Sequence, residues 1–395
     1  MALVATLPRD STAPGATYEV APSGSDSGDG SAARPWRTLK RGIEALHAGD
    51  TLLVHGGRYE EAVVGVDLRR GTPSARITVR AYPGERPVLS GLLSLRSASY
   101  WTLDGLDVTW GAASGADEGN RDHMIQMVGG EGWRIAHAEI WGARAYSALL
   151  IGGDASNWRV DHNVIRDTQP THDENQDHLV YIDTPVSGGI LERNLLAGSP
   201  NGRGVKIGPS DPGSSPVGGV TVRYNTVLDN TGPSNVQLSY GATGNRIYRN
   251  IFVGSAPGSA NVTGYNLEGS DNEVADNVGW GSTGVLDPLT GLEDMGGNLH
   301  LDPRLTPGLV PAEPRAVAYG RLAPGDDDAS AARRSTGWRA RPPRHEPGRR
   351  SVERRGVRCR ISPSRRRHGE RRPDPPSRSG ATRSRSSRRC KCPVV

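Results

Sequence analysis

Cysteine, lysine and phenylalanine are scarce in this chain of 395 residues, which holds three, three and one of them. All three cysteines follow residue 358, so the first 358 residues contain no disulfide, cysteine nucleophile or cysteine metal ligand. No apolar run is long enough to span a bilayer, and we expect no membrane association. Residues 1–16, which we expect to be disordered, lack a charged segment followed by an apolar one, so no signal peptide is visible.

Net positive charge is absent from the first 330 residues and is concentrated after them. Residues 331–395 contain 21 Arg and one Lys against four acids, a net charge of +18. Because the whole chain carries +5, the difference leaves −13 on residues 1–330. The basic balance of the chain therefore belongs to its last segment alone.

Residues 311–395 are predicted to be a disordered basic tail rich in Arg, Pro and Ser. Runs such as Arg365-Arg366-Arg367 have no aliphatic pattern and cannot bury a core. One interpretation is a nucleic-acid-binding arm. We favour another, in which an out-of-frame reading of a GC-rich segment produced the tail, and we expect no nucleic acid partner for the folded body.

A short phrase recurs through the middle of the chain, with a strand-like run, an asparagine and two or more apolar residues. Its asparagines are separated by 31, 31, 25 and 27 residues and are Asn163, Asn194, Asn225, Asn250 and Asn277. Two degenerate copies, at 134–140 and 102–108, precede them. A period in this range indicates stacked units that bury their apolar faces against one another. We expect the asparagines to be structural, because asparagine tolerates the left-handed conformation and can bond from coil to coil.

The segment before the repeats has the pattern of a cap. Leu39, Ile43 and Leu46 follow Thr38 at helical spacing, and Gly49 ends the segment. Strand-like runs at 51–54, 77–79 and 87–89 come next. The pattern predicts a short helix that covers the open end of a stack, where core and backbone groups would otherwise be exposed.

Three segments of the chain resemble a known family. The residues at 18–26, Pro35-Trp36-Arg37-Thr38-Leu39 and 48–59 are similar to the opening of bacterial right-handed parallel β-helix proteins of the pectate-lyase-like superfamily. The run at 298–305, with Asp302-Pro303, is similar to a segment that often ends such helices. The resemblance implies an all-β, single-stranded right-handed parallel β-helix over residues 17–310, with an N-terminal capping helix. It also implies a secreted protein, and we expect a monomer.

A second register gives each coil an outer face. Runs that alternate apolar and variable residues include Val180-Tyr181-Ile182-Asp183, Val205-Lys206-Ile207-Gly208 and Val236-Gln237-Leu238-Ser239. Since side chains alternate faces along a strand, the aliphatic first and third members should face the core. The outward column is then predicted to be Gln126, Leu150, Tyr181, Lys206, Gln237 and Thr263.

Lys206 is the residue of this column best suited to chemistry. It is the only lysine between Lys40 and Lys391 in a chain that otherwise uses arginine, and lysine can be driven toward its neutral, basic form. In β-helix lyases, the resemblance implies, a Lys or Arg on the outer sheet removes a proton next to a sugar carboxylate. Arg203, Tyr181 or His178 could bind that carboxylate or protonate the leaving oxygen. Each also has a purely structural interpretation.

We also predict contacts to substrate and to a metal ion. Gln126, Gln237 and Asn235 are candidates for binding an acidic polysaccharide. Oxygen ligands for Ca²⁺, which the family resemblance favours, could come from Asp173, Glu174, Asp177 and Asp183. A plain polar loop is the alternative for this acidic cluster.

Three classes of function remain open from the sequence. The first is a polysaccharide lyase that cleaves a uronic-acid polymer with Lys206 as base. The second is a glycoside hydrolase, which needs two carboxylates on the same face, and Asp183 has no acidic neighbour in the outer columns, although Asp177 or Asp211 could supply one. The third is a non-catalytic carbohydrate-binding or surface scaffold.

Overall fold

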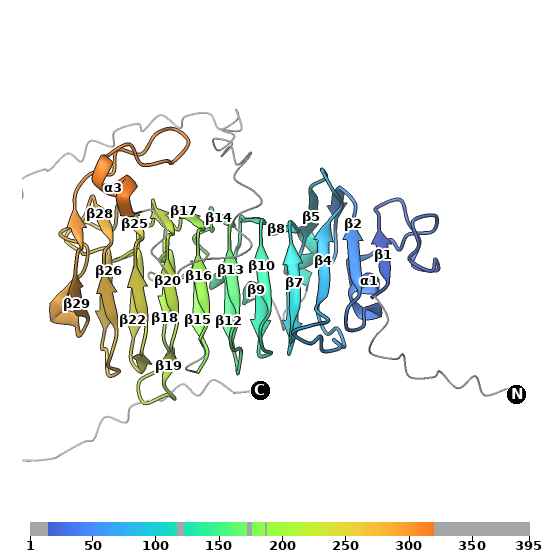
Figure 1. The fold of residues 1–395 in the computed structure, drawn as a ribbon, viewed down its shortest axis with the longest axis horizontal. Helices are drawn as coiled ribbons and strands as arrows, with labels where there is room; N and C mark the ends of the chain where they lie inside the picture. The colour runs from blue at the N-terminus through green and yellow to red at the C-terminus, as the bar shows by residue number, and fades with distance from the viewer. Residues whose placement is uncertain (1–14, 117–121, 172–175, 186–187, 320–395) are drawn as a thin grey trace, which may run out of the picture. The chain divides into compact units, whose positions relative to one another are not determined.

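Three long parallel sheets form the body of the protein in its computed structural model, which describes residues 15–116, 122–171, 176–185 and 188–319 (Figure 1). The first sheet contains β1 (Thr17–Val20), β2 (Thr51–Val54), β4 (Ile77–Ala81), β7 (Trp101–Asp104), β10 (Arg134–Ala136), β13 (Arg159–Asp161), β16 (Ile190–Glu192), β20 (Thr221–Arg223), β24 (Arg246–Tyr248), β27 (Glu273–Ala275) and β29 (Glu293–Gly296). The second contains β3 (Gly57–Tyr59), β5 (Pro87–Ser90), β8 (Asp107–Thr109), β11 (Glu139–Trp141), β14 (Val164–Arg166), β17 (Leu195–Ala197), β21 (Thr226–Leu228), β25 (Ile251–Val253), β28 (Val278–Trp280) and β30 (Leu299–His300). The third contains β6 (Leu93–Arg96), β9 (His123–Val128), β12 (Ser147–Gly152), β15 (His178–Asp183), β18 (Val205–Ile207), β22 (Val236–Ser239) and β26 (Val262–Tyr265).

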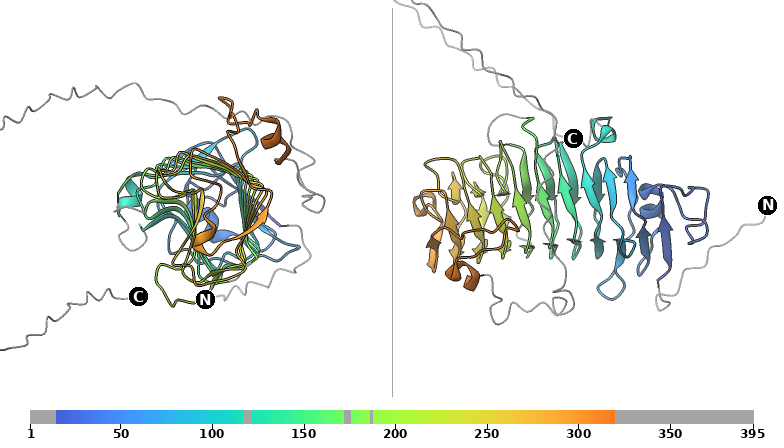
Figure 2. Two further views of the ribbon diagram at one scale, coloured as in Figure 1. Left: turned by 90° about the vertical axis from the view of Figure 1, so that its left-hand side faces the viewer. Right: turned by 90° about the horizontal axis from the view of Figure 1, so that it is seen from above.

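Each complete coil contributes one strand to each sheet, so that strands adjacent in a sheet come from successive coils. Figure 2 shows the coils superimposed around a common interior when the stack is viewed along its length. The short elements outside the three sheets are β19 (Val217–Gly218), β23 (Ala242–Thr243), α1 (Leu39–Ala45), α2 (Ala112–Ala116), η1 (Pro288–Thr290) and α3 (Pro314–Tyr319). The protein is a right-handed parallel β-helix, and the predicted fold class is confirmed. Among the described residues, no helix has the length and apolar composition needed to cross a bilayer.

The recurring phrase is two strands joined by a tight corner. Its first half lies in the first sheet and its second half in the second sheet, as in β13 and β14. The sequence predicts the left-handed conformation, in which φ is positive, for the asparagine. In the structure the residue before the asparagine adopts it instead, with φ of +56° at His162 and +53° at Arg193. The asparagine is instead turned into the fold, where its side chain bonds to the next coil.

The asparagines form a continuous internal ladder, which confirms the predicted coil-to-coil bonding. The amide Nδ2 of Asn194 donates to Oδ1 of Asn225 and to the carbonyl oxygen of Val160, at 3.0 and 2.9 Å. The same pattern links the rest of the column, which runs through Asn163, Asn194, Asn225, Asn250, Asn277 and Asn298. Because five of these six side chains are buried, the bonds satisfy polar groups that water does not reach.

The first coil is closed by α1, as the sequence predicts. The hydroxyl of Thr38 accepts from the backbone N–H of Arg41 and so caps the helix. Leu39, Ile43 and Leu46 are buried in the main core. At the other end, Ala316 of α3 packs against Ile251 and Val278 on the side of the last coils.

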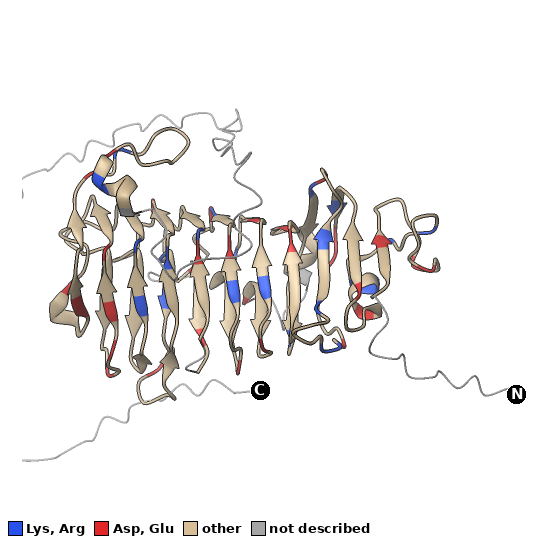
Figure 3. Ribbon diagram, in the orientation of Figure 1, with Lys and Arg blue, Asp and Glu red and all other residues tan. Residues whose placement is uncertain are grey.

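The outer face of the first sheet carries alternating charges. Figure 3 shows basic and acidic segments on neighbouring strands of this sheet. The carboxylate of Glu192 accepts hydrogen bonds from Arg159 and Arg223, and Arg134 is paired with Asp161. The charges in this ladder satisfy one another, and the sheet has the character of a scaffold.

Candidate functional site

The third sheet carries the predicted outer column. The pairing of β9, β12, β15, β18, β22 and β26 brings Gln126, Leu150, Tyr181, Lys206, Gln237 and Thr263 into one register. Lys206 is therefore a direct neighbour of Tyr181 on one side and of Gln237 on the other. The alternation of side chains along each run was sufficient to predict this arrangement.

Lys206 is a partly buried cation that lies against an aromatic ring. Its Nζ is 4.5 Å from the centre of the Tyr181 ring. Burial, together with the nearby positive charge of Arg203, lowers the pKa of Lys206, whereas Asp183 and Asp211 act in the opposite direction. The pKa is lowered overall, which increases the fraction of neutral amine relative to a solvated lysine, and the neutral amine is the form able to remove a proton.

Tyr181 and Asp183 border the amine. The hydroxyl of Tyr181 is 2.8 Å from the hydroxyl of Ser210 and 3.5 Å from Oδ2 of Asp183. Burial, and then the charge of Asp183, raises the pKa of the Tyr181 phenol, so the phenol holds its proton. Burial also raises the pKa of Asp183, an effect that Lys206 opposes. The hydroxyl of Ser210, on the loop after β18, was not predicted from the sequence.

His178 and Arg203 lie beneath this surface. The side chains are almost fully buried, and Nδ1 of His178 accepts from the backbone N–H of Arg203 at 3.2 Å. The imidazole proton is therefore on Nε2, which has no hydrogen-bond partner among the described residues. Burial, reinforced by the charges of Arg203 and Lys206, holds the pKa of His178 well below its usual value, so the ring is neutral.

Arg203 supplies positive charge close to the amine. Burial lowers the pKa of its guanidinium to about 10, which leaves it protonated at neutral pH. Because the side chain is 3% exposed, it acts on Lys206 mainly through its electric field.

His123, on β9, extends the site toward earlier coils. Its Nδ1 is 2.9 Å from the hydroxyl of Ser147. Its ring centre is 6.2 Å from that of Tyr181 and 6.3 Å from that of Tyr146. His123 and His178 are both the first residues of their strands.

Two of the three predicted substrate contacts lie in the outer column, and one lies inside the fold. Gln126 and Gln237 are in register with Lys206, although each is only 6–7% exposed. Asn235 is fully buried, and its amide bonds to Asn230, Asn261 and the carbonyl oxygen of Gly254. Asn235 is thus part of a second internal asparagine network, and it cannot reach a ligand on the outer face.

The predicted metal ligands are only partly described. Asp173 and Glu174 lie outside the described residues. The carboxylate of Asp177 is buried and accepts from Thr171 and Asn201. Across the described ranges, no three His, Cys, Asp or Glu side chains come together as metal ligands. The described residues therefore do not fit a calcium ion on their own.

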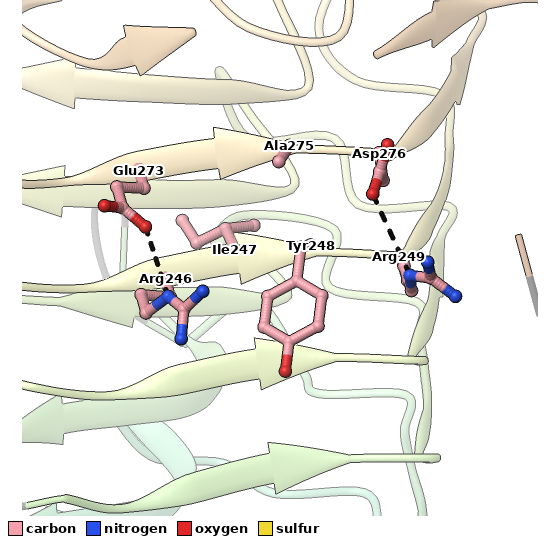
Figure 4. A pocket seen from close by; sticks show the side chains of 7 residues that line it. All are labelled: Arg246, Ile247, Tyr248, Arg249, Glu273, Ala275 and Asp276. Atoms are coloured by element: carbon pink, nitrogen blue, oxygen red, sulfur yellow. Dashed lines mark hydrogen bonds and ion pairs between the residues drawn. The ribbon is translucent and has the colours of Figure 1, made fainter. Parts of the chain in front are cut away.

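Two hollows lie away from Lys206. One, of about 300 Å³, is on the first sheet between β24 and β27 (Figure 4). The figure shows its charged residues joined in pairs, Arg246 with Glu273 and Arg249 with Asp276. The other, of about 610 Å³, follows the second sheet and is lined by residues that include Trp110, Trp141 and Arg144.

Comparison with known proteins finds other right-handed parallel β-helices that resemble this chain. The sequence model of the family described as "Pel9A-like, right handed beta helix region" matches residues 18–146. The crystal structure of pectate lyase Pel9A is similar with a TM-score of 0.54 and 15% identity, over 73% of this chain and 79% of that one. At this identity the likeness shows the fold alone.

Two curated relatives match parts of the chain. The uncharacterized protein YwoF of Bacillus subtilis (strain 168) is 29% identical over 161 residues, which is 40% of this chain and 30% of that protein. Pectate lyase PEL9 of Emericella nidulans is 26% identical over 109 residues, 22% of this chain and 27% of the relative. The matches thus span less than a third of the length of these relatives.

The fold and the outer column define the class of this protein, which is a right-handed parallel β-helix with a polar outer sheet. Within that class, residues 18–146 are similar to the Pel9A-like β-helix region. The resemblance drawn from the sequence is confirmed at this level.

Proposed function

We propose that the protein is a polysaccharide lyase that cleaves a polymer containing uronic acids by β-elimination, with Lys206 as the base. The observation that carries the proposal is the position of Lys206, a lone lysine with a lowered pKa between Tyr181 and Gln237 on the outer face. Pectate lyases among the similar proteins support the same class of reaction. A polymeric substrate of this kind favours an extracellular place of action.

In the proposed reaction, the neutral amine of Lys206 takes the proton from the carbon next to the sugar carboxylate. The electron pair of that C–H bond forms a carbon–carbon double bond, and the bond from the adjacent carbon to the glycosidic oxygen breaks. The leaving oxygen receives a proton from the hydroxyl of Tyr181, which keeps its proton because its pKa is raised. The buried charge of Arg203 stabilises the carboxylate as negative charge spreads onto it.

The first test is Lys206→Ala, assayed on polymers of galacturonate, mannuronate and guluronate. The new double bond, conjugated with the carboxylate, absorbs in the ultraviolet. Since a positioned base contributes about 10²–10⁴-fold, we expect kcat to fall by that factor while the melting temperature stays unchanged. Lys40→Ala is the matched control, because the amine of Lys40 bonds to the carbonyl oxygen of Val64 away from this site. A Lys206→Ala protein with normal kcat would exclude Lys206 as base.

Calcium is a further part of the proposal, and it depends on Asp173 and Glu174. Activity lost to a chelator and restored by added calcium would support it. Activity that persists after chelation would remove the metal from the reaction.

A glycoside hydrolase is the second candidate, because two carboxylates approach the same amine. Asp183 and Asp211 both act on the charge of Lys206, and Asp183 has the raised pKa that suits a general acid. Hydrolysis would release reducing ends without a double bond, and Asp183→Asn and Asp211→Asn would each abolish that release. If no polymer is cleaved, a carbohydrate-binding scaffold is the remaining function.

A further inference from the structure

The hollow beside the second sheet has the composition of a ligand pocket. It is about 610 Å³ in volume and is lined by Trp110, Trp141, Arg144 and Gln169, together with small residues of β8, α2 and the turn after β11. Pockets of this size, lined by aromatic rings with a few polar groups, are typical sites for small organic ligands. Nothing in the proposed elimination uses these residues.

The tryptophans at 110, 133, 141 and 158 have two different environments. Trp133 and Trp158 are buried and stack on each other, with ring centres 5.7 Å apart, so they belong to the core. Trp110 and Trp141 are only partly buried and border the hollow. Part of each indole is therefore accessible to a ligand, and a sugar ring can pack on it.

The charges around the hollow favour an anion. Arg166 lies over the Trp141 ring at 5.7 Å, but its own charge is paired with Glu139 and Asp167. Arg144 is exposed and forms no ion pair with any residue that the structure describes. It can therefore bind a carboxylate through two parallel hydrogen bonds.

A run of rings leads from Tyr146, close to Arg144 in the sequence, to Lys206. Tyr146, 38% exposed, lies two residues after Arg144, and its ring is 6.3 Å from that of His123. His123 in turn lies 6.2 Å from Tyr181, whose ring contacts Lys206. Trp141 belongs to the coil two steps before that of Lys206, which at about 4.8 Å a step is about 10 Å along the stack.

We propose that this hollow is a second sugar subsite, which binds an acidic residue of the same glycan chain that reaches Lys206. Trp110 and Trp141 provide the packing surface, and Arg144 binds the carboxylate. The inference takes its ligand class from the proposed function. Because the sites lie on different sheets and two coils apart, we expect only an oligosaccharide of several units to occupy both.

The test measures binding by calorimetry in the full chain carrying Lys206→Ala, so that the ligand is not cleaved. The ligands are oligogalacturonides and oligomannuronates of increasing length. We expect Trp141→Ala and Arg144→Ala each to weaken the long oligomers by about tenfold, as one lost aromatic or charged contact would do. The affinity for dimers should be the same in these variants as in the parent protein. Trp280→Ala and Arg80→Ala, exposed residues of the same types elsewhere, are the matched controls.

The possible outcomes separate the two proposals. Three results would overturn the subsite. The first is unchanged affinity for long oligomers, and the second is an equal loss of affinity for dimers and long oligomers. The third is that neither series of oligomers binds. Arg144→Ala guards against a folding defect, because this exposed side chain forms no ion pair or hydrogen bond within the described structure that the substitution would remove. A further result is that the natural chain cleaves no polymer, while long oligomers still bind through Trp141 and Arg144. That result would contradict the proposed lyase activity and support the subsite.

Discussion

The pKa of Lys206 is set by burial and by the charges of three neighbours. Burial and the charge of Arg203 both disfavour the ammonium form, while Asp183 and Asp211 favour it. The balance keeps the pKa below that of a solvated lysine, and the Tyr181 ring occupies one side of the amine. A base needs a pKa near the working pH, and this balance shifts the pKa of Lys206 downward, toward that range.

The pH dependence of kcat/KM follows from this balance. Lys206 acts when deprotonated, so kcat/KM should rise with pH through its pKa, at lower pH than for an ordinary lysine. Arg203→Gln removes a like charge, raises that pKa and should shift the rise to higher pH. Asp211→Asn removes an opposite charge and should shift it to lower pH.

These two variants are measured against the natural chain at constant ionic strength, since salt screens the exposed Asp211 most. Asp271→Asn, an exposed acid elsewhere, serves as control for a lost surface charge. Shifts of the same sign in Arg203→Gln and Asp211→Asn would contradict the assignment of Lys206 as the titrating base.

Sequence alternation places residues well within strands and poorly at their ends. Tyr181, Lys206 and Gln237 lie inside regular runs, so their shared face was predictable. Asn235 precedes its strand at a corner, where the period of two no longer holds, and its side chain turns into the fold. The position of Ser210 and the shape of the hollow at Trp141 depend on how loops from different coils pack together. No local sequence pattern predicts such packing.

The asparagine ladder is the element that holds the corners of successive coils together. Nδ2 of Asn225 donates to Oδ1 of Asn250 and to the carbonyl oxygen of Leu191, and its own Oδ1 accepts from Asn194. The repeat made the ladder predictable. The conformation of the corner was not, since it is the preceding residue that takes positive φ.

Replacing one asparagine in the middle of the ladder should destabilise the fold. Asn225→Ala leaves buried groups of Asn194 and Leu191 without partners, and each such group costs about 1–3 kcal/mol. We expect a loss of about 2–5 kcal/mol in urea unfolding. Asn298→Ala is the comparison, because this last member of the ladder is partly exposed and water can replace its bonds. Equal losses at both positions would show that burial does not set the strength of the ladder.

At the scale of the whole β-helix, stability depends on covering apolar surface at the first coil and near the last coils. At the first coil, α1 buries Leu39 and Ile43 in the main core. Near the last coils, Ala316 covers Ile251 and Val278 on the outside of the second sheet. The sequence predicted the first closure from helical spacing. The boundary predicted from the sequence, residue 310, lies before α3. This helix was not predicted, because six residues after a proline-rich segment have too little periodicity to be recognised.

The contribution of α3 can be measured with two truncations. A chain that ends at residue 310 loses Ala316 and exposes apolar surface of Ile251 and Val278, whereas one that ends at residue 319 keeps this contact. At about 25 cal/mol per Å² of exposed apolar surface, we expect the shorter chain to be less stable by about 2 kcal/mol. Urea unfolding would show a lower midpoint for the shorter chain alone. Identical midpoints would mean that α3 only rests on a stack already complete at residue 310, because an element that buries core surface cannot be removed without cost.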